Sequence, residues 1–91
     1  MSVTVRVPTQ LRPLTGGKGE ISVEASTVGE ALKALDVAHP GLDERLFDET
    51  GQLRRFVNVF VAEEDVRFLE GLDTPVGAGQ VVSIVPAVAG G

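Results

Sequence analysis

The stretch Phe56-Val57-Asn58-Val59-Phe60-Val61-Ala62 has the clearest strand pattern in the chain. Three valines alternate with the other side chains, and alternation places successive side chains on opposite faces of a sheet. The all-valine face is expected to point into the core, which leaves the face with Asn58 outward. Phe56 and Phe60 would then stand on the outer face, where an exposed aromatic pair is typical of an interface. The alternative is that a long loop covers both rings.

Three other segments alternate in the same way. Residues 3–8 and residues 20–24 are predicted to form a first hairpin, with Val23 and Ile21 of the second strand pointing inward. Residues 81–85 are predicted to form the last strand, with Val82 and Ile84 inward and Val85 outward. Residues 11–19, which join the first two strands, are rich in turn residues and are expected not to be helical.

One main helix is expected between the hairpin and the central strand. Thr27-Val28-Gly29-Glu30 is a capping-box signature, in which the Thr27 oxygen accepts a hydrogen bond from the backbone three residues on. His39-Pro40-Gly41 is expected to end the helix. The apolar positions repeat at a spacing of three and four residues and form a stripe that can lie across a sheet. They are Val28, Ala31, Leu32, Leu35 and Ala38.

The remaining segments carry weaker signals. Residues 42–47 are expected to form one short helical turn that buries Leu42, Leu46 and Phe47. Residues 65–68 are expected to form a short edge strand, with Val66 and Phe68 as candidates for burial. Residues 71–79 are expected to be a loop anchored by Leu72 and Val76.

The resulting order is strand, strand, helix, strand, short strand, strand. It indicates an α+β fold of the β-grasp type, with a mixed sheet of four to five strands and one main helix packed across it. The predicted domain spans residues 1–86, and residues 87–91 are expected to be a flexible C-terminal tail.

Composition excludes several classes of function. The chain has 91 residues, which suffices for one domain and one core but not for a deep, enclosed active site. It has no cysteine, so disulfides, cysteine-ligated metals and cysteine nucleophiles are excluded. The net charge of −5 argues against nucleic acid as a partner and favours a protein partner with a basic face. No membrane span or signal peptide is apparent, which favours a cytoplasmic location without membrane contact.

Other candidate sites are weak. Gly17-Lys18 lacks the first glycine and the following Ser or Thr of a phosphate-binding loop. His39 is the only histidine and has no second nitrogen or sulfur ligand in its vicinity, so neither a metal nor a catalytic role is expected. A solvated face explains the acidic cluster better than a metal site does, because the spacing does not converge the carboxylates on one point. The cluster comprises Asp43, Glu44, Asp48 and Glu49.

The chain ends in Val85-Pro86-Ala87-Val88-Ala89-Gly90-Gly91, in which no residue after Pro86 is larger than valine. A slim, flexible end of this kind can enter a channel too narrow for most side chains. It can therefore bring its own terminal carboxylate against the α-phosphate of ATP in another protein's active site. The alternative is a frayed terminus that happens to end in glycine.

This ending resembles that of the ubiquitin-like sulfur carriers of the MoaD and ThiS family. The similarity continues through residues 3–8, 11–17, 55–61 and 64–68, so that it covers nearly the whole chain, and it is greatest to the longer actinobacterial form, CysO. The resemblance implies a β-grasp fold in which the first and last strands are central and parallel. Phe60 and Val85 would then lie near each other on the outer face, beside the exit of the tail.

The resemblance also implies a function in which the chain is a protein cosubstrate and not an enzyme. The Gly91 carboxylate would be adenylated and converted to a thiocarboxylate, while Gly90, Ala89, Val88 and Ala87 thread into the activating enzyme. That enzyme would be an adenylyltransferase of the ubiquitin-activating type, similar to MoeB and ThiF, which supplies ATP and Mg²⁺, so no cofactor is expected on this chain. We expect it to grip Phe56, Phe60 and Val85.

In the actinobacterial members, the family implies delivery of sulfur to a cysteine synthase that uses O-phosphoserine, with a zinc peptidase releasing the product. Other members supply sulfur for cofactors or secondary metabolites. Two alternatives remain open. A ubiquitin-like modifier would join Gly91 to partner lysines, and a regulatory β-grasp domain would leave Gly91 chemically unchanged.

Overall fold

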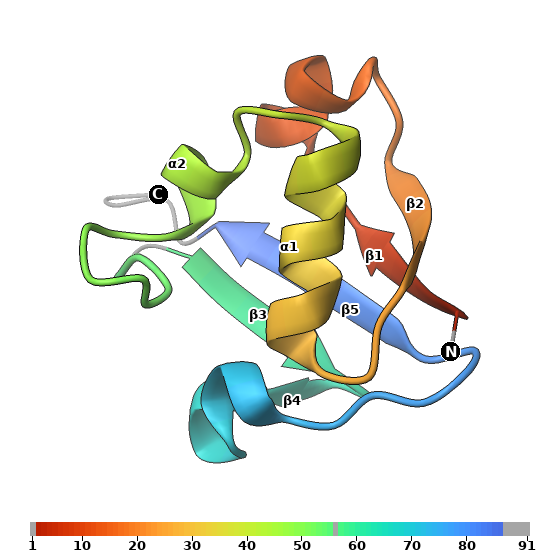
Figure 1. Ribbon diagram of the computed structural model, residues 1–91, viewed down its shortest axis with the longest axis vertical. Helices are drawn as coiled ribbons and strands as arrows, with labels where there is room; N and C mark the ends of the chain where they lie inside the picture. The colour runs from red at the N-terminus through yellow and green to blue at the C-terminus, as the bar shows by residue number, and fades with distance from the viewer. Residues whose placement is uncertain (1, 56, 87–91) are drawn as a thin grey trace.

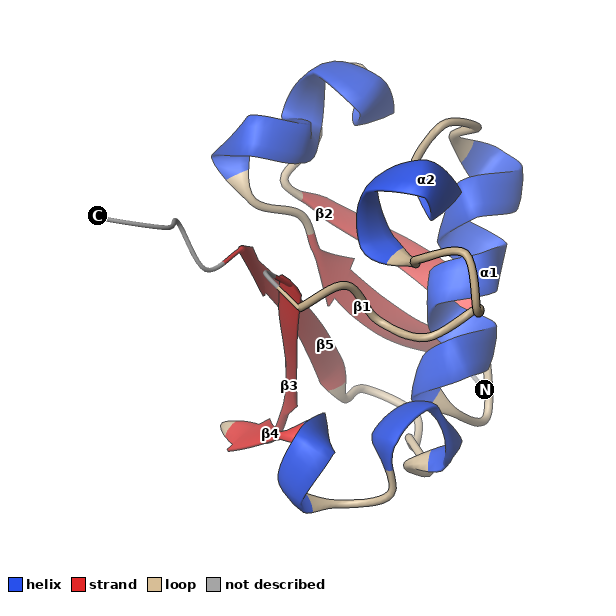
Figure 2. Cartoon of the chain, turned by 90° about the vertical axis from the view of Figure 1, so that its left-hand side faces the viewer, coloured by secondary structure: helices blue, strands red, loops and turns tan. Residues whose placement is uncertain are grey.

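The computed structural model describes residues 2–55 and 57–86. Within these residues, five strands form one mixed sheet in the order β2-β1-β5-β3-β4, and the sheet and α1 form two layers (Figures 1 and 2). The strands are β1 (Ser2–Arg6), β2 (Glu20–Glu24), β3 (Val57–Val61), β4 (Glu64–Asp65) and β5 (Val81–Pro86). The helices are α1 (Val28–Ala38) and α2 (Asp43–Leu46), with three 3₁₀ segments, η1 (Thr9–Thr15), η2 (Val66–Phe68) and η3 (Gly71–Asp73).

The topology confirms the predicted β-grasp arrangement. β1 and β2 pair antiparallel as the first hairpin, and β1 pairs parallel with β5 in the centre of the sheet. β3 lies antiparallel to β5 on its other side and carries the two-residue strand β4 at the edge. The chain therefore ends its described part on a strand with a neighbour on each side.

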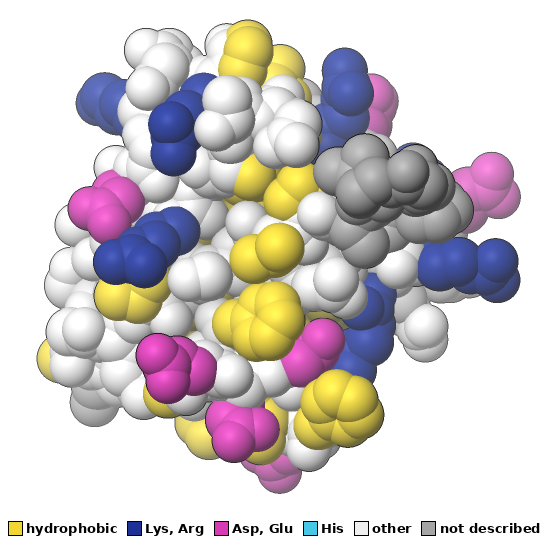
Figure 3. All heavy atoms as spheres, turned by 180° about the vertical axis from the view of Figure 1, so that it is seen from behind, with side chains coloured by type: hydrophobic (Ala, Val, Ile, Leu, Met, Phe, Trp, Pro, Cys, Tyr) yellow, Lys and Arg dark blue, Asp and Glu magenta, His cyan; other side chains and the backbone are white. Residues whose placement is uncertain are grey.

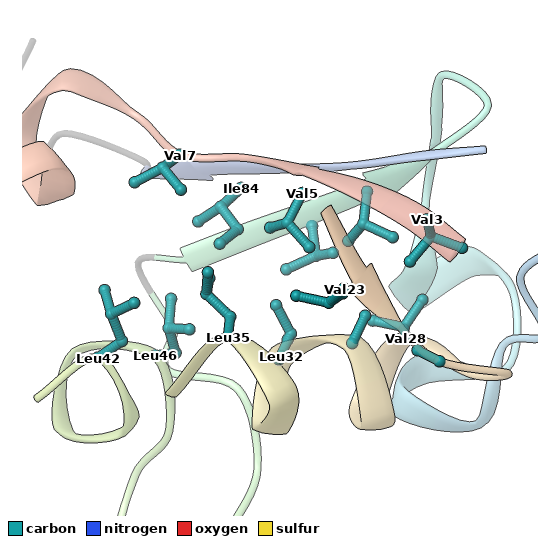
Figure 4. Packing of buried hydrophobic residues seen from close by; sticks show 14 of the residues in the cluster. Val3, Val5, Val7, Val23, Val28, Leu32, Leu35, Leu42, Leu46 and Ile84 are labelled. Atoms are coloured by element: carbon teal, nitrogen blue, oxygen red, sulfur yellow. The ribbon is translucent and has the colours of Figure 1, made fainter. Parts of the chain in front are cut away.

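The core lies between α1 and one face of the sheet (Figure 4). The valine face of β3 is buried as predicted, and Val82 and Ile84 of β5 lie in the same core. Leu32 and Leu35 of α1 are fully buried against them. Each large aliphatic side chain that leaves water in this way contributes roughly 1.5–3 kcal/mol. Ala38 lies at the exposed end of α1, so its predicted place in the buried stripe is wrong.

The ends of α1 form as the sequence indicates. The Thr27 side chain accepts a hydrogen bond from the Glu30 amide at 3.2 Å, and the Glu30 carboxylate accepts one from the Ser26 amide at 2.9 Å. These bonds satisfy amides that have no partner inside the helix. The helix ends at Ala38, directly before His39-Pro40-Gly41.

Two local predictions are wrong. Residues 9–15 form the 3₁₀ helix η1, although no helix was expected there. The 3₁₀ helix tolerates Pro13 and buries Leu11, and it ends at Thr15, directly before Gly16, whose φ of 68° suits glycine. Residues 65–68 do not continue as a strand, because the chain turns into η2 after Asp65.

Candidate functional site

The described part of the chain ends at Pro86, and the sheet holds this end firmly. β1 pairs with residues 81–83 of β5, and β3 pairs with residues 82–86. The last residue pair of this ladder joins Pro86 to Val57 at the start of β3. The segment that precedes the Gly-Gly end is therefore fixed in position by the two strands beside it.

The outer face of the sheet, away from α1, carries a patch of apolar side chains (Figure 3). On β3 and β5, Phe60 stands opposite Ser83, and Asn58 stands opposite Val85. Phe60 is half-buried, and Val85 is 44% exposed. Because side chains two residues apart on one strand share a face, Phe60 and Val85 are diagonal neighbours on this surface, as predicted. We call Asn58, Phe60, Ser83 and Val85 the outer patch.

Arg67 braces one end of the outer patch. Its guanidinium donates hydrogen bonds to the Asn58 side-chain oxygen at 2.6 Å, to the Arg54 carbonyl at 2.9 Å and to the Val57 carbonyl at 2.8 Å. Two of these acceptors belong to the first two residues of β3, and the third, Arg54, lies just before the strand. Arg67 thus fixes the start of the strand that pairs with Pro86.

Several predicted site residues lie outside the described part of the chain. They are the tail residues Ala87, Val88, Ala89, Gly90 and Gly91, and Phe56 of the proposed partner-binding pair. Of the three residues expected to bind the activating enzyme, the structure places Phe60 and Val85 together on the outer patch. Their role in binding, and that of the tail in chemistry, stay predictions.

The acidic residues singled out in the sequence lie on the opposite side of the molecule. Asp43, Asp48 and Glu49 line an open hollow of about 660 Å³ beside α1, together with Glu30 and Lys33. Within residues 2–55 and 57–86, no three His, Cys, Asp or Glu side chains are arranged to hold a metal ion. In the same ranges, no helix is both long and apolar enough to cross a membrane.

Sequence reasoning missed Arg67 and misplaced Phe68. Val66 and Phe68 would lie on the same face only if residues 65–68 formed a strand. In η2, Val66 is buried, whereas Phe68 is 84% exposed. A signal was available, since an Asp at the start of a turn often accepts from the amide two residues on. The Asp65 carboxylate accepts in this way from the Arg67 amide at 2.8 Å.

Comparison with known proteins places these features in a family. The ThiS family model matches residues 5–91. The sulfur carrier protein CysO of Mycobacterium tuberculosis is 48% identical over 93 residues, which cover 100% of both chains. The small archaeal modifier protein 3 of Haloferax volcanii is 38% identical over 66 residues, covering 72% of this chain and 71% of that protein.

A solved structure shows the same fold. The crystal structure of the Amycolatopsis orientalis BexX/CysO complex contains a chain that matches with a TM-score of 0.91 and 45% identity, over 98% of this chain and 99% of that one. Sequence and fold agree over almost the full length, as the resemblance implied. The chain belongs to the ThiS family of ubiquitin-like sulfur carrier proteins, whose members act as carriers and not as catalysts.

Proposed function

We propose that this chain carries sulfur as a thiocarboxylate on Gly91, after an ATP-dependent partner enzyme has activated the terminal carboxylate. The observation that carries the proposal is the full-length similarity to CysO, at 48% identity, in a chain that itself ends in Gly90-Gly91. The central position of β5 supports it, because the sheet fixes the position of Pro86, which precedes Gly91 by five residues in the sequence.

The chemistry requires activation because a C-terminal carboxyl group has a pKa of about 3.3–3.7 and is an ionised, poor electrophile at neutral pH. A carboxylate oxygen of Gly91 attacks the α-phosphorus of ATP and expels pyrophosphate, which leaves an acyl-adenylate. A donor whose sulfur is at the oxidation state of sulfide then attacks the acyl carbon and expels AMP. The product is the thiocarboxylate, in which sulfur has replaced one oxygen.

The partner supplies the phosphate chemistry in this scheme. We propose an adenylyltransferase of the ubiquitin-activating type, similar to MoeB and ThiF, which holds ATP and Mg²⁺ and stabilises the developing phosphate charge. This chain contributes the slim tail, Ala87 to Gly91, and a binding surface formed by Phe56, Phe60 and Val85. A half-buried ring beside a 44% exposed valine offers apolar area close to Pro86, the last described residue before the tail.

The sulfur acceptor is a second partner. We propose a sulfur-inserting enzyme such as a cysteine synthase that uses O-phosphoserine, with a zinc peptidase to release the amino acid, in the cytoplasm. That a CysO chain has been crystallised together with BexX supports the view that carriers of this type act in complexes with other proteins.

A second candidate function is conjugation, since a small archaeal modifier protein is 38% identical over 66 residues. In that case the activated Gly91 carbonyl would be attacked by a lysine amine of another protein instead of by a sulfur donor, and an amide would form.

Intact-mass analysis of the chain purified from its own host tests both functions. A sulfur carrier gains the mass difference between sulfur and oxygen, and this species disappears when Gly91 is deleted. A modifier appears as branched conjugates that also require Gly91. An unchanged terminus after incubation with the activating enzyme, ATP, Mg²⁺ and sulfide would contradict the proposal.

A further inference from the structure

Phe68 is an aromatic side chain that the fold leaves in water. It is 84% exposed, and the neighbouring Leu69 is 44% exposed. Sequence periodicity predicted that Phe68 would be buried beside Val66, and in the structure only Val66 is. Large exposed apolar side chains that adjoin one another are characteristic of binding surfaces.

The backbone of η2 enforces this exposure. The Arg67 amide donates to the Asp65 carboxylate at 2.8 Å, and the Leu69 amide donates to the Val66 carbonyl at 2.9 Å. Two residues before Phe68, Val66 is buried in the core. The residue between them, Arg67, donates a hydrogen bond from its guanidinium to the Asn58 side-chain oxygen at 2.6 Å. Phe68 cannot turn inward without breaking these contacts. The backbone that carries the ring is therefore already ordered, so a partner that covers the ring has to fix only its side-chain torsions.

The segment around Phe68 is acidic, which favours a partner with a basic surface. The segment from residue 63 to residue 73 contains five carboxylates and one guanidinium. The carboxylates belong to Glu63, Glu64, Asp65, Glu70 and Asp73. The single guanidinium, that of Arg67, is engaged within the molecule. A second copy of the chain would bring like charges together, whereas a pocket rimmed by Lys and Arg would complement them.

The Phe68 surface adjoins the outer patch. Asp65, directly before η2, pairs with Phe60 across β3 and β4, and Arg67 bonds to Asn58 within the outer patch. A protein that covers Phe60 and Val85 and extends past the β4 edge of the sheet would therefore meet η2.

We infer that Phe68, supported by Leu69, is a docking anchor that enters an apolar pocket with a basic rim on the activating enzyme. This inference rests on the proposed function and extends its binding surface beyond Phe60 and Val85. The pocket would recognise the ring, and the basic rim would steer the acidic segment toward it.

The test compares Phe68→Ser with Val37→Ser, since Val37 is 81% exposed on α1, the other side of the molecule. The assay is ATP–pyrophosphate exchange by the ubiquitin-activating-type adenylyltransferase of the same organism. Phe68→Ser should raise the KM for the carrier by about tenfold and leave kcat unchanged, as expected for loss of one interface anchor. Val37→Ser should change neither value by more than about twofold. Equal effects of the two substitutions, or an unchanged KM for Phe68→Ser, would overturn the inference.

A charge reversal tests the basic rim. Glu70→Lys and Glu44→Lys change the net charge equally, but Glu44 lies on α2, beside α1. Glu70→Lys should raise KM several-fold at low salt and lose this effect at high salt, because salt screens exposed charges. Glu44→Lys should have little effect. Identical behaviour of the two variants would refute the charge argument.

Two further outcomes separate this inference from the proposed function. If the wild-type chain supports no exchange at all, the proposed function fails and the inference fails with it. If exchange occurs but sedimentation shows a wild-type dimer that Phe68→Ser dissociates, Phe68 binds a second copy, and only the inference is wrong. All four variants should keep the unfolding temperature of the wild type, since the replaced side chains are exposed.

Discussion

The guanidinium of Arg67 donates a 2.6 Å hydrogen bond to the side-chain oxygen of Asn58. Two further bonds, at 2.9 and 2.8 Å, join the same guanidinium to the carbonyls of Arg54 and Val57. One side chain thereby ties η2 to the start of β3, and β3 in turn pairs with Pro86 at the root of the tail. The brace links the exposed ring of Phe68 to the strand pair that carries the C-terminus.

Replacing Arg67 by methionine should destabilise the domain by about 1–3 kcal/mol. The substitution keeps much of the apolar stem but removes three charge-assisted donors. Urea denaturation followed by circular dichroism measures the change. Arg6→Met is the matched control, because Arg6 makes an exposed ion pair with Glu20 at 3.1 Å, and such pairs contribute about 0–1 kcal/mol. If both variants lose the same stability, the brace adds nothing beyond an ordinary surface pair.

Leu35→Ala should cost about 2–5 kcal/mol of unfolding free energy. Leu35 is fully buried between α1 and the sheet, so truncation removes apolar contacts and leaves a cavity. Val37→Ala, two residues along the same helix, should change stability by no more than about 0.5 kcal/mol, since Val37 is 81% exposed. Comparable losses in the two variants would mean that α1 packs through a different face.

Phe60→Ala should weaken adenylation of the carrier with little change in thermal stability. The ring is half-buried and stands opposite the small side chain of Ser83, which leaves part of it open to a partner. The KM of the activating enzyme for the carrier, compared between variant and wild type, measures the effect. Val59→Ala provides the contrast, because Val59 is fully buried and its truncation should cost about 2 kcal/mol. A collapse of thermal stability in Phe60→Ala would place this ring in the core.

The carboxylate of Asp48 has a pKa below its ordinary value of 3.8 because the Thr50 hydroxyl, foremost, and the amides of Thr50 and Gln52 donate hydrogen bonds to it. A pKa that is lower in the folded than in the unfolded state adds stability above the unfolded pKa. That stability is lost as the pH falls below 3.8 and through the lowered folded pKa. Thr50→Val should raise the Asp48 pKa toward 3.8, as measured by NMR titration of its side-chain carboxyl. An unchanged titration would show that the hydroxyl is not the main cause.

The sequence identified the elements that depend on local pattern. The valine alternation of β3, the capping box at Thr27 and the stop after Ala38 are properties of short segments, and each appears as expected. The parallel pairing of β1 with β5 came only from the family resemblance, because no local periodicity reports which strands are neighbours.

Only the tertiary structure decided which side chains of η2 are buried and which are exposed. Alternation in residues 65–68 assigned Val66 and Phe68 to one side, but the chain leaves the strand after Asp65 and separates them. The turn itself is local, since the Arg67 amide bonds to Asp65, but its position is fixed over a long range, because the acceptors of the Arg67 guanidinium lie 9 to 13 positions earlier in the chain. Local spacing specifies faces of a helix or strand, whereas the exposure of Phe68 also depends on contacts between segments that meet only after folding. By itself, the sequence supplied the basis for the chemistry that we propose at Gly91, namely small residues after Pro86 and a Gly90-Gly91 ending.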